Sequence, residues 1–372
     1  MLKRFFVDNY KCLVNFDMGL PQVGCLVGPN GSGKSAFFSA LQGLQAFLSG
    51  APIEDAFQSW TRTRWASRER QRFEMEVIGR GGTPFRYELL VLHEEKTRRS
   101  VVEHETVSSS GALLYEQVNG EVRLFGDEPT HAPRTAFPSD PRRSFLSVLQ
   151  PRPDSRLLAE FKEWHAKMWL FSLRPFDISP DSTGEASILT TDGKNFVSWY
   201  RTILQETPAM ATQIWEDLRP VIPGLQTISL GQLGLNTRAL FLECQFPSAK
   251  PFRLSIAEIS EGQRSLLLLY TILHALAPAA SLIVFDEPDN FVAEVEIEPW
   301  LSRIREVVVD AKRGTLIAIS HHPQVIDYLA ADQVWELSRT EEGPTRIRDI
   351  NVPREKGMTA SEFLRLGVAD GK

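Results

Sequence analysis

Cysteine is scarce in this chain of 372 residues, and the three that occur stand far apart. Cys12, Cys25 and Cys244 match neither a disulfide framework nor the ligand spacing of a zinc site. We therefore expect three buried thiols in a reducing compartment.

A long apolar run and a strong excess of one charge are also missing. The most apolar stretch, 266–277, contains His274 and stops at Pro278, so it is too short to cross a bilayer. Asp8 interrupts the position where a secretory signal needs continuous apolar residues. The net charge of −6 excludes a wholly basic nucleic-acid coat, although it leaves room for a local basic surface. These features predict a cytoplasmic protein that does not associate with membranes.

Heptads, internal repeats and low-complexity tracts are absent too, which excludes a fibrous or repetitive protein. The composition, 42% apolar and 24% charged, is ordinary for a globular protein. A chain of this length can form two or three domains, each with its own hydrophobic core.

A complete phosphate-binding loop stands out against this ordinary background. Residues 28–35 fit G-x-x-x-x-G-K-[ST], between the apolar run 23–27 and a segment with helical apolar spacing from residue 36 on. Glycines let the backbone curl so that amides point at phosphate oxygens, and the helix N-terminus adds its positive dipole end. A chance glycine-rich turn is the alternative. The residues we expect around the phosphates are Gly28, Pro29, Asn30, Gly31, Ser32, Gly33, Lys34, Ser35 and Ala36.

Two of these side chains have predictable roles in a nucleoside triphosphate site. Lys34 reaches the β- and γ-phosphates, and Ser35 places its hydroxyl on Mg²⁺. The sequence therefore predicts ATP and Mg²⁺ as ligands.

The second half of such a site is an apolar strand that ends in two carboxylates. Residues 282–287 read Leu-Ile-Val-Phe-Asp-Glu, which would bring Asp286 and Glu287 to the carboxyl edge of a parallel sheet. We expect Asp286 to hold Mg²⁺ and Glu287 to polarise the attacking water. A strand followed by a solvated turn is the alternative.

A polar turn, residues 259–264, opens the long apolar helix 265–277 and lies 26 residues before Asp286. With this element the chain resembles the ATP-binding-cassette (ABC) type of ATPase, whose signature is a Ser-Gly-rich turn at a helix start. The resemblance implies that Ser260, Gly262 and Gln263 meet the γ-phosphate bound to a second protomer, so that two heads enclose two ATP molecules. A plain helix cap is the alternative reading of the same turn.

The resemblance also assigns a switch histidine. Residues 315–322 form an apolar strand that ends in Ser-His-His, 35 residues after Asp286. Following the strand-Ser-His order, we assign to His321 contact with the γ-phosphate and the attacking water, and treat His322 as its neighbour.

Within this class the chain is most similar to the RecF-like and OLD-like heads, which insert a β-rich lobe and a short helical arm. Residues 36–259 separate the motifs, too far for a compact transporter cassette, and heptads are too few for the arms of the chromosome-maintenance (SMC) ATPases. The predicted fold is α/β, a P-loop ABC-type ATPase head. Its parts are an N-terminal lobe with antiparallel β structure (1–134), an inserted helical arm (135–225) and a C-terminal lobe (226–372).

The chain departs from the family pattern in two places. The glutamine that couples the first lobe to the metal has no clear position, with Gln58 and Gln71 as candidates. After Glu287 the family often carries a Gly-Leu-His-Pro-like turn, whereas residues 290–293 here read Asn-Phe-Val-Ala.

The resemblance implies ATP binding and hydrolysis by a head dimer, in phage defence or DNA repair. We expect a separate effector such as a nuclease, because about 50 residues after His322 leave no room for a further catalytic domain. The alternatives are a transporter ATPase subunit and a nearly inactive, ATP-gated scaffold or sensor. Double-stranded DNA is a further expected partner, because residues 60–72 hold five arginines and two tryptophans. A solvated face with paired arginines is the other reading of that segment.

Overall fold

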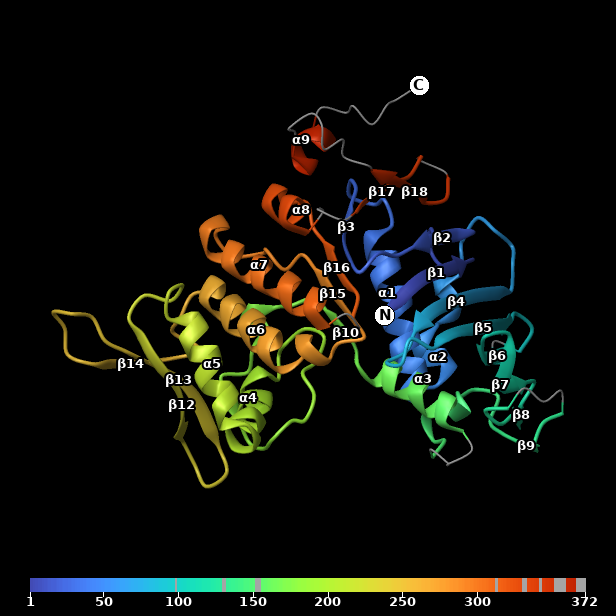
Figure 1. The fold of residues 1–372 in the computed structure, drawn as a ribbon, viewed down its shortest axis with the longest axis horizontal. Coiled ribbons are helices and arrows are strands. Elements are labelled where there is room, and N and C mark those ends of the chain that lie inside the picture. Colours follow the sequence, from blue (N-terminus) through green and yellow to red (C-terminus); the bar gives the residue numbers. More distant parts are fainter. Residues whose placement is uncertain are drawn as a thin grey trace.

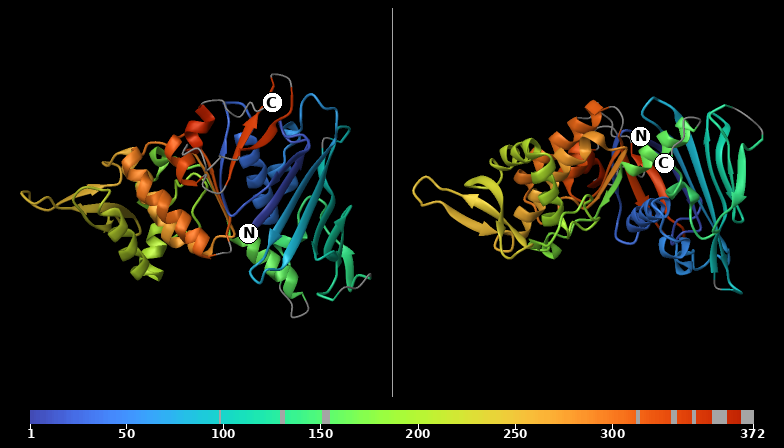
Figure 2. Two further views of the ribbon diagram at one scale, coloured as in Figure 1. Left: turned by 45° about the horizontal axis from the view of Figure 1, so that its top comes forward. Right: turned by 90° about the horizontal axis from the view of Figure 1, so that it is seen from below.

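The computed structural model describes residues 1–97, 99–128, 132–150, 155–311, 314–329, 333–340, 343–350 and 359–365. Within these ranges the chain forms three sheets, with helices packed between and around them (Figures 1 and 2). The two larger sheets build the head, and the third lies at the opposite end of the molecule.

The central layer is a six-stranded sheet whose first five strands run parallel. Its strands lie in the order β10 (Met168–Phe171), β15 (Leu282–Asp286), β16 (Leu316–Ile319), β3 (Val23–Val27), β17 (Val334–Ser338) and β18 (Arg346–Ile350). Four of them are short apolar runs because helices or a second sheet cover both faces. The parallel arrangement brings the carboxyl ends of β3, β15 and β16 to one edge.

The second layer is an eight-stranded antiparallel sheet. Its strands follow the order β2 (Phe16–Gly19), β1 (Leu2–Asp8), β4 (Arg70–Ile78), β5 (Pro84–Glu94), β6 (Arg99–Ser109), β7 (Ala112–Val118), β8 (Glu121–Leu124) and β9 (Thr135–Pro138). Along β5 buried residues alternate with exposed or half-buried ones. The sheet therefore has one wet face, and it supplies the antiparallel β structure expected in the N-terminal lobe.

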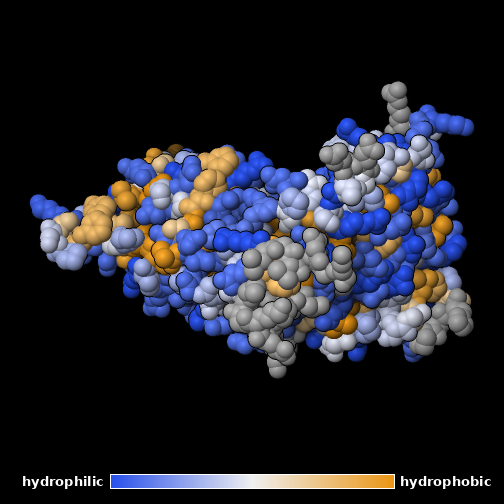
Figure 3. Space-filling model, turned by 90° about the horizontal axis from the view of Figure 1, so that it is seen from above, coloured by the Kyte–Doolittle hydropathy of each residue, from blue (hydrophilic) through white to orange (hydrophobic). Residues whose placement is uncertain are grey.

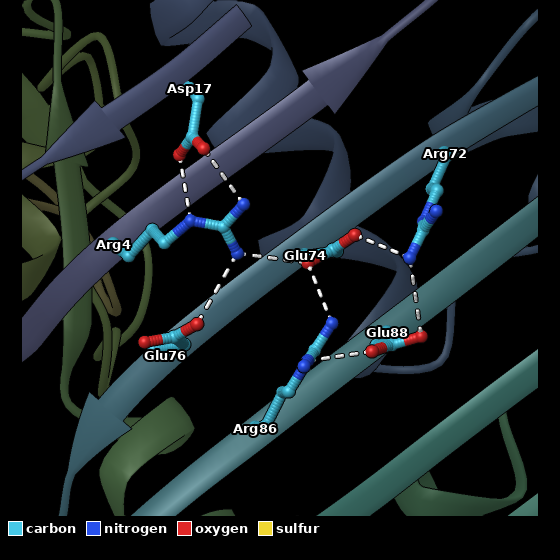
Figure 4. Close-up of polar contacts among 7 residues, drawn as sticks. All are labelled: Arg4, Asp17, Arg72, Glu74, Glu76, Arg86 and Glu88. Carbon is cyan, nitrogen blue, oxygen red and sulfur yellow. Dashed lines mark hydrogen bonds and ion pairs between the residues drawn. The ribbon is translucent and has the colours of Figure 1, made fainter. Parts of the chain in front are cut away.

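Ion pairs cover part of that wet face (Figure 4). The Glu74 carboxylate, only 4% exposed, accepts from Arg4 at 2.9 Å, Arg86 at 3.1 Å and Arg72 at 2.7 Å. Arg4 also binds Asp17 at 2.7 Å. Strands β1, β2, β4 and β5 are thus joined by charges as well as by their backbone ladder.

Helix α1 (Lys34–Leu48) lies between the two sheets, and α3 (Arg156–Ala166) packs into the same apolar core. The aromatic rings of this core meet edge to face, for example Phe5 against Phe37 at 5.6 Å between centroids. Two short helices follow α1, namely α2 (Ile53–Ala56) and η1 (Ser59–Thr61), and η2 (Phe145–Ser147) precedes α3. The core fixes α1 against the sheet edge that carries the predicted site.

A second core covers the other face of the six-stranded sheet. The elements that contribute to it are α6 (Glu261–Ala275), α7 (Glu294–Ala311), α4 (Phe196–Glu206), α5 (Pro208–Leu218), β12 (Leu225–Gln232), β13 (Arg238–Cys244) and β14 (Phe252–Ser255). The short strand β11 (Asp181–Ser182) pairs with β13. Smaller elements complete the described chain: η3 (Pro175–Asp177), η4 (Ala277–Ala279), α8 (Pro323–Leu329) and α9 (Ala360–Arg365).

The helical arm has narrower bounds than the 135–225 that the sequence suggests. β9 is the last strand of the eight-stranded sheet, and β10 pairs in parallel with β15 inside the central sheet. A run of four apolar residues is too short to show the periodicity of a strand or of a helix, so the sequence does not predict β10. The helices that project away from the head are α4 and α5, which pack on α6.

Apolar side chains are exposed at the end of the molecule formed by the third sheet (Figure 3). Leu235, between β12 and β13, is 96% exposed, and Leu233 and Phe246 are exposed as well. No helix in the described ranges is both long enough and apolar enough to cross a membrane.

Candidate nucleotide-binding site

The phosphate loop joins β3 to α1 in a conformation that only glycine adopts easily. Gly28 has φ 147° and Gly33 has φ 116°. A Cβ at Gly28 would lie 2.2 Å from the Leu337 carbonyl oxygen, and one at Gly33 would lie 2.4 Å from Thr345 Oγ1. Both positions therefore need glycine for the backbone angle and for space, and the loop is held close to the β17 side of the sheet.

Helix α1 presents an open N-terminus to this loop. Gly33 is its N-cap, none of the described side chains caps it, and its first turn contains no acidic residue. Unpaired amides and the helix dipole favour an anion at such a terminus. The Lys34 ammonium donates to the carbonyls of Gly28 at 2.6 Å and Pro29 at 3.1 Å, so its charge lies over the loop.

Two carboxylates face this charge from the end of β15. Burial lowers the pKa of Lys34, while the negative charges of Glu287 and Asp286 raise it, so the three groups interact. Burial and the charge of Glu287 raise the pKa of Asp286. Asn290 Nδ2 donates to Glu287 Oε2 at 2.8 Å. Glu287 itself has φ 52°, a left-handed backbone conformation that non-glycine residues adopt rarely.

A cavity of about 620 Å³ lies between these elements, a size typical of ligand sites. It brings together most of the residues predicted to bind the nucleotide. The predicted residues that line it are Asn30, Gly31, Gly33, Lys34, Ser35, Ala36, Asp286 and Glu287.

Three members of the loop lie outside this lining. Pro29 and Ser32 line a smaller hollow of about 210 Å³, which shares Asn30, Gly31 and Arg339 with the cavity. Ser32 Oγ is buried and has no hydrogen-bond partner within the described residues. Gly28, the first residue of the loop, packs against the Leu337 carbonyl.

The signature turn forms a complete capping box at the start of α6. Ser260 Oγ accepts from the Gln263 amide at 3.2 Å, and Gln263 Oε1 accepts from the Ser260 amide at 3.1 Å. A Cβ at Gly262 would lie 2.5 Å from the Phe291 carbonyl oxygen, so the turn packs on the segment that follows Glu287. None of the three predicted signature residues lines the cavity.

The two histidines after β16 have different surroundings. Burial lowers the pKa of His321, and Lys34 lowers it further, while Glu287 and Asp289 raise it. His321 is therefore close enough to Lys34 and Glu287 to sense both charges. His322 instead approaches Glu294 at 3.2 Å, at the start of α7.

Several cavity residues escaped the sequence analysis as nucleotide contacts. They are Lys11, Cys12, Trp60, Arg62, Arg64, Trp65 and Arg339. Ser172, just after β10, donates to Asp286 Oδ2 at 3.5 Å. Trp60, Trp65 and the arginines at 62 and 64 belong to the segment predicted to contact DNA, but no local pattern ties them to the phosphate loop.

The two candidate coupling glutamines have structural partners. Gln71 is fully buried and bonds the Asn9 carbonyl at 2.9 Å and His93 Nε2 at 2.8 Å. Gln58 accepts from the Trp60 indole. Neither glutamine lines the cavity. The side chain beside Asp286 is instead that of Ser172.

The donor set fits a magnesium ion. Burial and the charge of Glu287 raise the pKa of Asp286 at the sheet edge, and a nearby divalent cation would relieve the cost of ionising it. The Ser35 hydroxyl lines the same cavity. Among the described residues no cluster of three or more His, Cys, Asp or Glu side chains could hold a metal by itself. Mg²⁺ usually takes one or two protein ligands and completes its shell with phosphate oxygens and water.

Comparisons with known proteins agree with this architecture. A family model described as "AAA domain, putative AbiEii toxin, Type IV TA system" matches residues 243–327, which include the signature turn, β15 and His321. A comparison with curated protein sequences gave no match.

Solved structures match over nearly the whole chain. The SMC head bound to the C-terminal winged-helix domain of ScpA aligns with a TM-score of 0.55 and 14% identity, covering 96% of this chain and 99% of that one. The SMC head with an extended coiled coil, bound to the C-terminal domain of ScpA derived from Pyrococcus furiosus, gives 0.55 and 12%, covering 98% and 99%. The chain therefore has the fold of a P-loop ATPase head of the ABC type, which it shares with these SMC heads.

Proposed function

We propose that this chain binds Mg²⁺ and ATP, that two copies close around the nucleotide, and that hydrolysis reopens them. One observation carries the proposal: the uncapped start of α1, the Lys34 ammonium and the carboxylates after β15 share one cavity. This is the arrangement that phosphoryl transfer requires, because its catalysis consists mainly of positioning and charge neutralisation.

The side chains divide the work as follows. Lys34 and the loop amides would bind the β- and γ-phosphates, and Ser35 and Asp286 would hold Mg²⁺. The metal, when bound, neutralises the charge that develops on the phosphate oxygens. Glu287 accepts a proton from the attacking water, and the bond from Asn290 orients its carboxylate. His321 adds a neutral imidazole near the γ-phosphate, because Lys34 and burial oppose its protonation.

We infer the closure of two copies because the signature residues are missing from the cavity lining. The signature residues Ser260, Gly262 and Gln263 do not line the cavity of their own chain. Helix α6 begins with this turn, and the Glu261 and Gly262 amides, which the capping box does not use, can meet an anion supplied from outside. A second copy that brings its signature turn to the γ-phosphate would complete the site.

The ATP cycle would switch a DNA grip or a separate effector, in phage defence or DNA repair. The matched family model is named for a toxin of a toxin–antitoxin system, which supports a defence role. The matched SMC heads are bound to ScpA domains, which supports control through a protein partner.

Steady-state ATP hydrolysis, measured over a range of protein concentrations with and without double-stranded DNA, tests the proposal. We expect a rate that rises more than linearly with protein concentration, because the catalytic unit is a pair of heads. Stimulation by DNA would support a DNA grip, whereas indifference to DNA would favour an effector or scaffold. A rate strictly proportional to protein concentration would contradict closure of two copies.

A further inference from the structure

Two exposed tryptophans lie beside the phosphate loop. Trp60 and Trp65 are 59% and 48% exposed, whereas the other six tryptophans of the chain are buried or half-buried. Both line the cavity that contains Lys34 and Asp286. Tryptophan supplies a large flat apolar surface, so two exposed rings in a binding cavity point to a ligand with a flat apolar part.

Trp60 is held in place on the α1 side of the cavity. Its indole donates to Gln58, and the Lys11 ammonium lies 5.8 Å from the centre of its ring. Lys11 also donates to Ser39 Oγ at 2.8 Å. Ser39 lies one helical turn after Ser35 on α1. Because Lys11 contacts both Ser39 and the Trp60 ring, the ring lies near the first turns of α1, close to the phosphate loop.

Trp65 is fixed from a different part of the chain. The Arg339 guanidinium, just after β17, lies 5.0 Å from the centre of its ring, within the range of a cation–π contact. Arg339 also lines the cavity. The two rings are therefore held by contacts to separate elements, which lowers the entropy cost of ligand binding.

The arginines of this segment are not equivalent. Arg62 pairs with Glu95 at 3.3 Å, and Arg68 pairs with Asp8 at 2.6 Å. Arg64 is exposed, lines the cavity and has neither an ion pair nor a hydrogen bond to any residue in the described ranges. One cation therefore remains available for an anionic ligand.

We propose that residues 60–65 form the wall that binds the base and sugar of the nucleotide, with Trp60 and Trp65 stacking on the base and Arg64 facing the ribose or the phosphates. This inference rests on the proposed binding of a nucleoside triphosphate at the phosphate loop. Because every base has a flat π face, stacking accepts different bases and favours the larger purines. The ligand class is a purine nucleoside triphosphate.

The same residue types occur in sites for single-stranded nucleic acid, but their position here favours a mononucleotide. The rings line the same cavity as Lys34 and Glu287, so they lie within reach of a ligand whose phosphates bind the loop. A strand-binding surface would instead need a series of free cations, and four of the five arginines in residues 60–72 are paired with carboxylates.

Calorimetric titration of MgATP and of inorganic tripolyphosphate separates base binding from phosphate binding. The variants are Trp60→Ala with Trp65→Ala, and Trp60→Phe with Trp65→Phe, which keeps a stacking surface. Phe176→Ala, which removes an exposed aromatic ring outside the cavity lining, is the matched control. A single-stranded oligonucleotide is titrated in parallel.

We expect the double alanine variant to lose at least about tenfold in MgATP affinity, because stacking is lost, and to keep its affinity for tripolyphosphate. The phenylalanine pair and the control should retain most of the MgATP affinity. Unchanged MgATP affinity, an equal loss for both ligands, or a loss confined to the oligonucleotide would overturn the inference while the proposed function stands. A wild-type protein that binds neither phosphate ligand would overturn both.

Discussion

The outer face of the eight-stranded sheet and the cavity beside the phosphate loop are both rich in charged side chains, but within the described residues these are paired on the sheet and largely unpaired in the cavity. On the sheet, the Glu74 carboxylate is shared by Arg4, Arg72 and Arg86 (Figure 4). In the cavity, Arg64 is exposed without a partner in the described structure, and burial and the charge of Glu287 oppose the ionisation of Asp286.

This difference separates structural from functional charge. A satisfied ion-pair network stabilises the fold and leaves little capacity for a ligand. Charges that are left unpaired, or held next to a like charge, carry a cost that only a ligand removes. The surface with more arginines is therefore not the better candidate for binding. What indicates a binding site is whether each charged side chain already has a partner within the protein.

The largest expected effect comes from the cavity. Lys34→Ala removes the cation that lies over the loop, so MgATP affinity should fall by about a hundredfold or more. Lys250→Ala, at an exposed position between β13 and β14, is the matched control and should bind normally. Calorimetric titration measures both, and normal binding by the Lys34 variant would remove the basis of the proposed site.

The network on the sheet should respond in stability instead. Glu74→Ala leaves three arginines without their shared acceptor, and we expect the free energy of unfolding to fall by roughly 2–4 kcal/mol. Glu76→Ala, which removes one exposed partner at 3.3 Å, should cost under about 1 kcal/mol. Urea unfolding measures both values. A change in MgATP affinity in either variant would break the distinction between the two regions.

Two arginines in one segment sharpen the comparison. Arg64→Ala removes a free cation from the cavity, and we expect MgATP affinity to fall by about tenfold. Arg68→Ala removes a cation already paired with Asp8 and should leave the affinity within a factor of about two. The reverse ranking in the same titration would show that pairing does not predict function here.

The smallest effect concerns a buried carboxyl on the inner side of the sheet. Burial raises the pKa of Glu105 to about 7, although Ser144, Tyr115 and Tyr87 donate to it. The folded protein then binds this proton more tightly than the unfolded chain does. Stability should therefore fall as pH rises from about 4.5 to 7.

Glu105→Gln should flatten that fall, and urea unfolding at several pH values measures it. An equally steep fall in the variant would assign the pH dependence to other groups. Glu116→Gln, at a half-buried position on the neighbouring β7, provides the control and should keep the wild-type slope.

The sequence predicted the parts of the site that are contiguous in the chain. The loop 28–35 and the pair after residue 285 each combine a buried apolar strand with the groups that follow it, so local order alone places them at one sheet edge. The antiparallel sheet was also predictable, because its strands alternate with period two.

The wall of the cavity was not predictable in the same way. Tyr10 pairs with Arg62 in an isolated bridge, and the Lys11 amide donates to the Thr61 carbonyl, so contacts fifty residues apart bring this segment to the loop. β10 and Ser172 were missed because their neighbours in space come from β15, more than a hundred residues later. Tertiary packing supplies information that a local pattern does not contain.

The measurement that tests the central claim most directly is the mass of the Glu287→Gln variant in solution, with and without MgATP, by light scattering. The substitution keeps the residues that bind phosphate and metal but removes the group that accepts the proton from water. The account predicts a monomer without nucleotide and a stable dimer with MgATP, and a monomer in both conditions when Lys34→Ala is added. A Glu287→Gln protein that binds MgATP and stays monomeric would contradict the proposed closure of two heads.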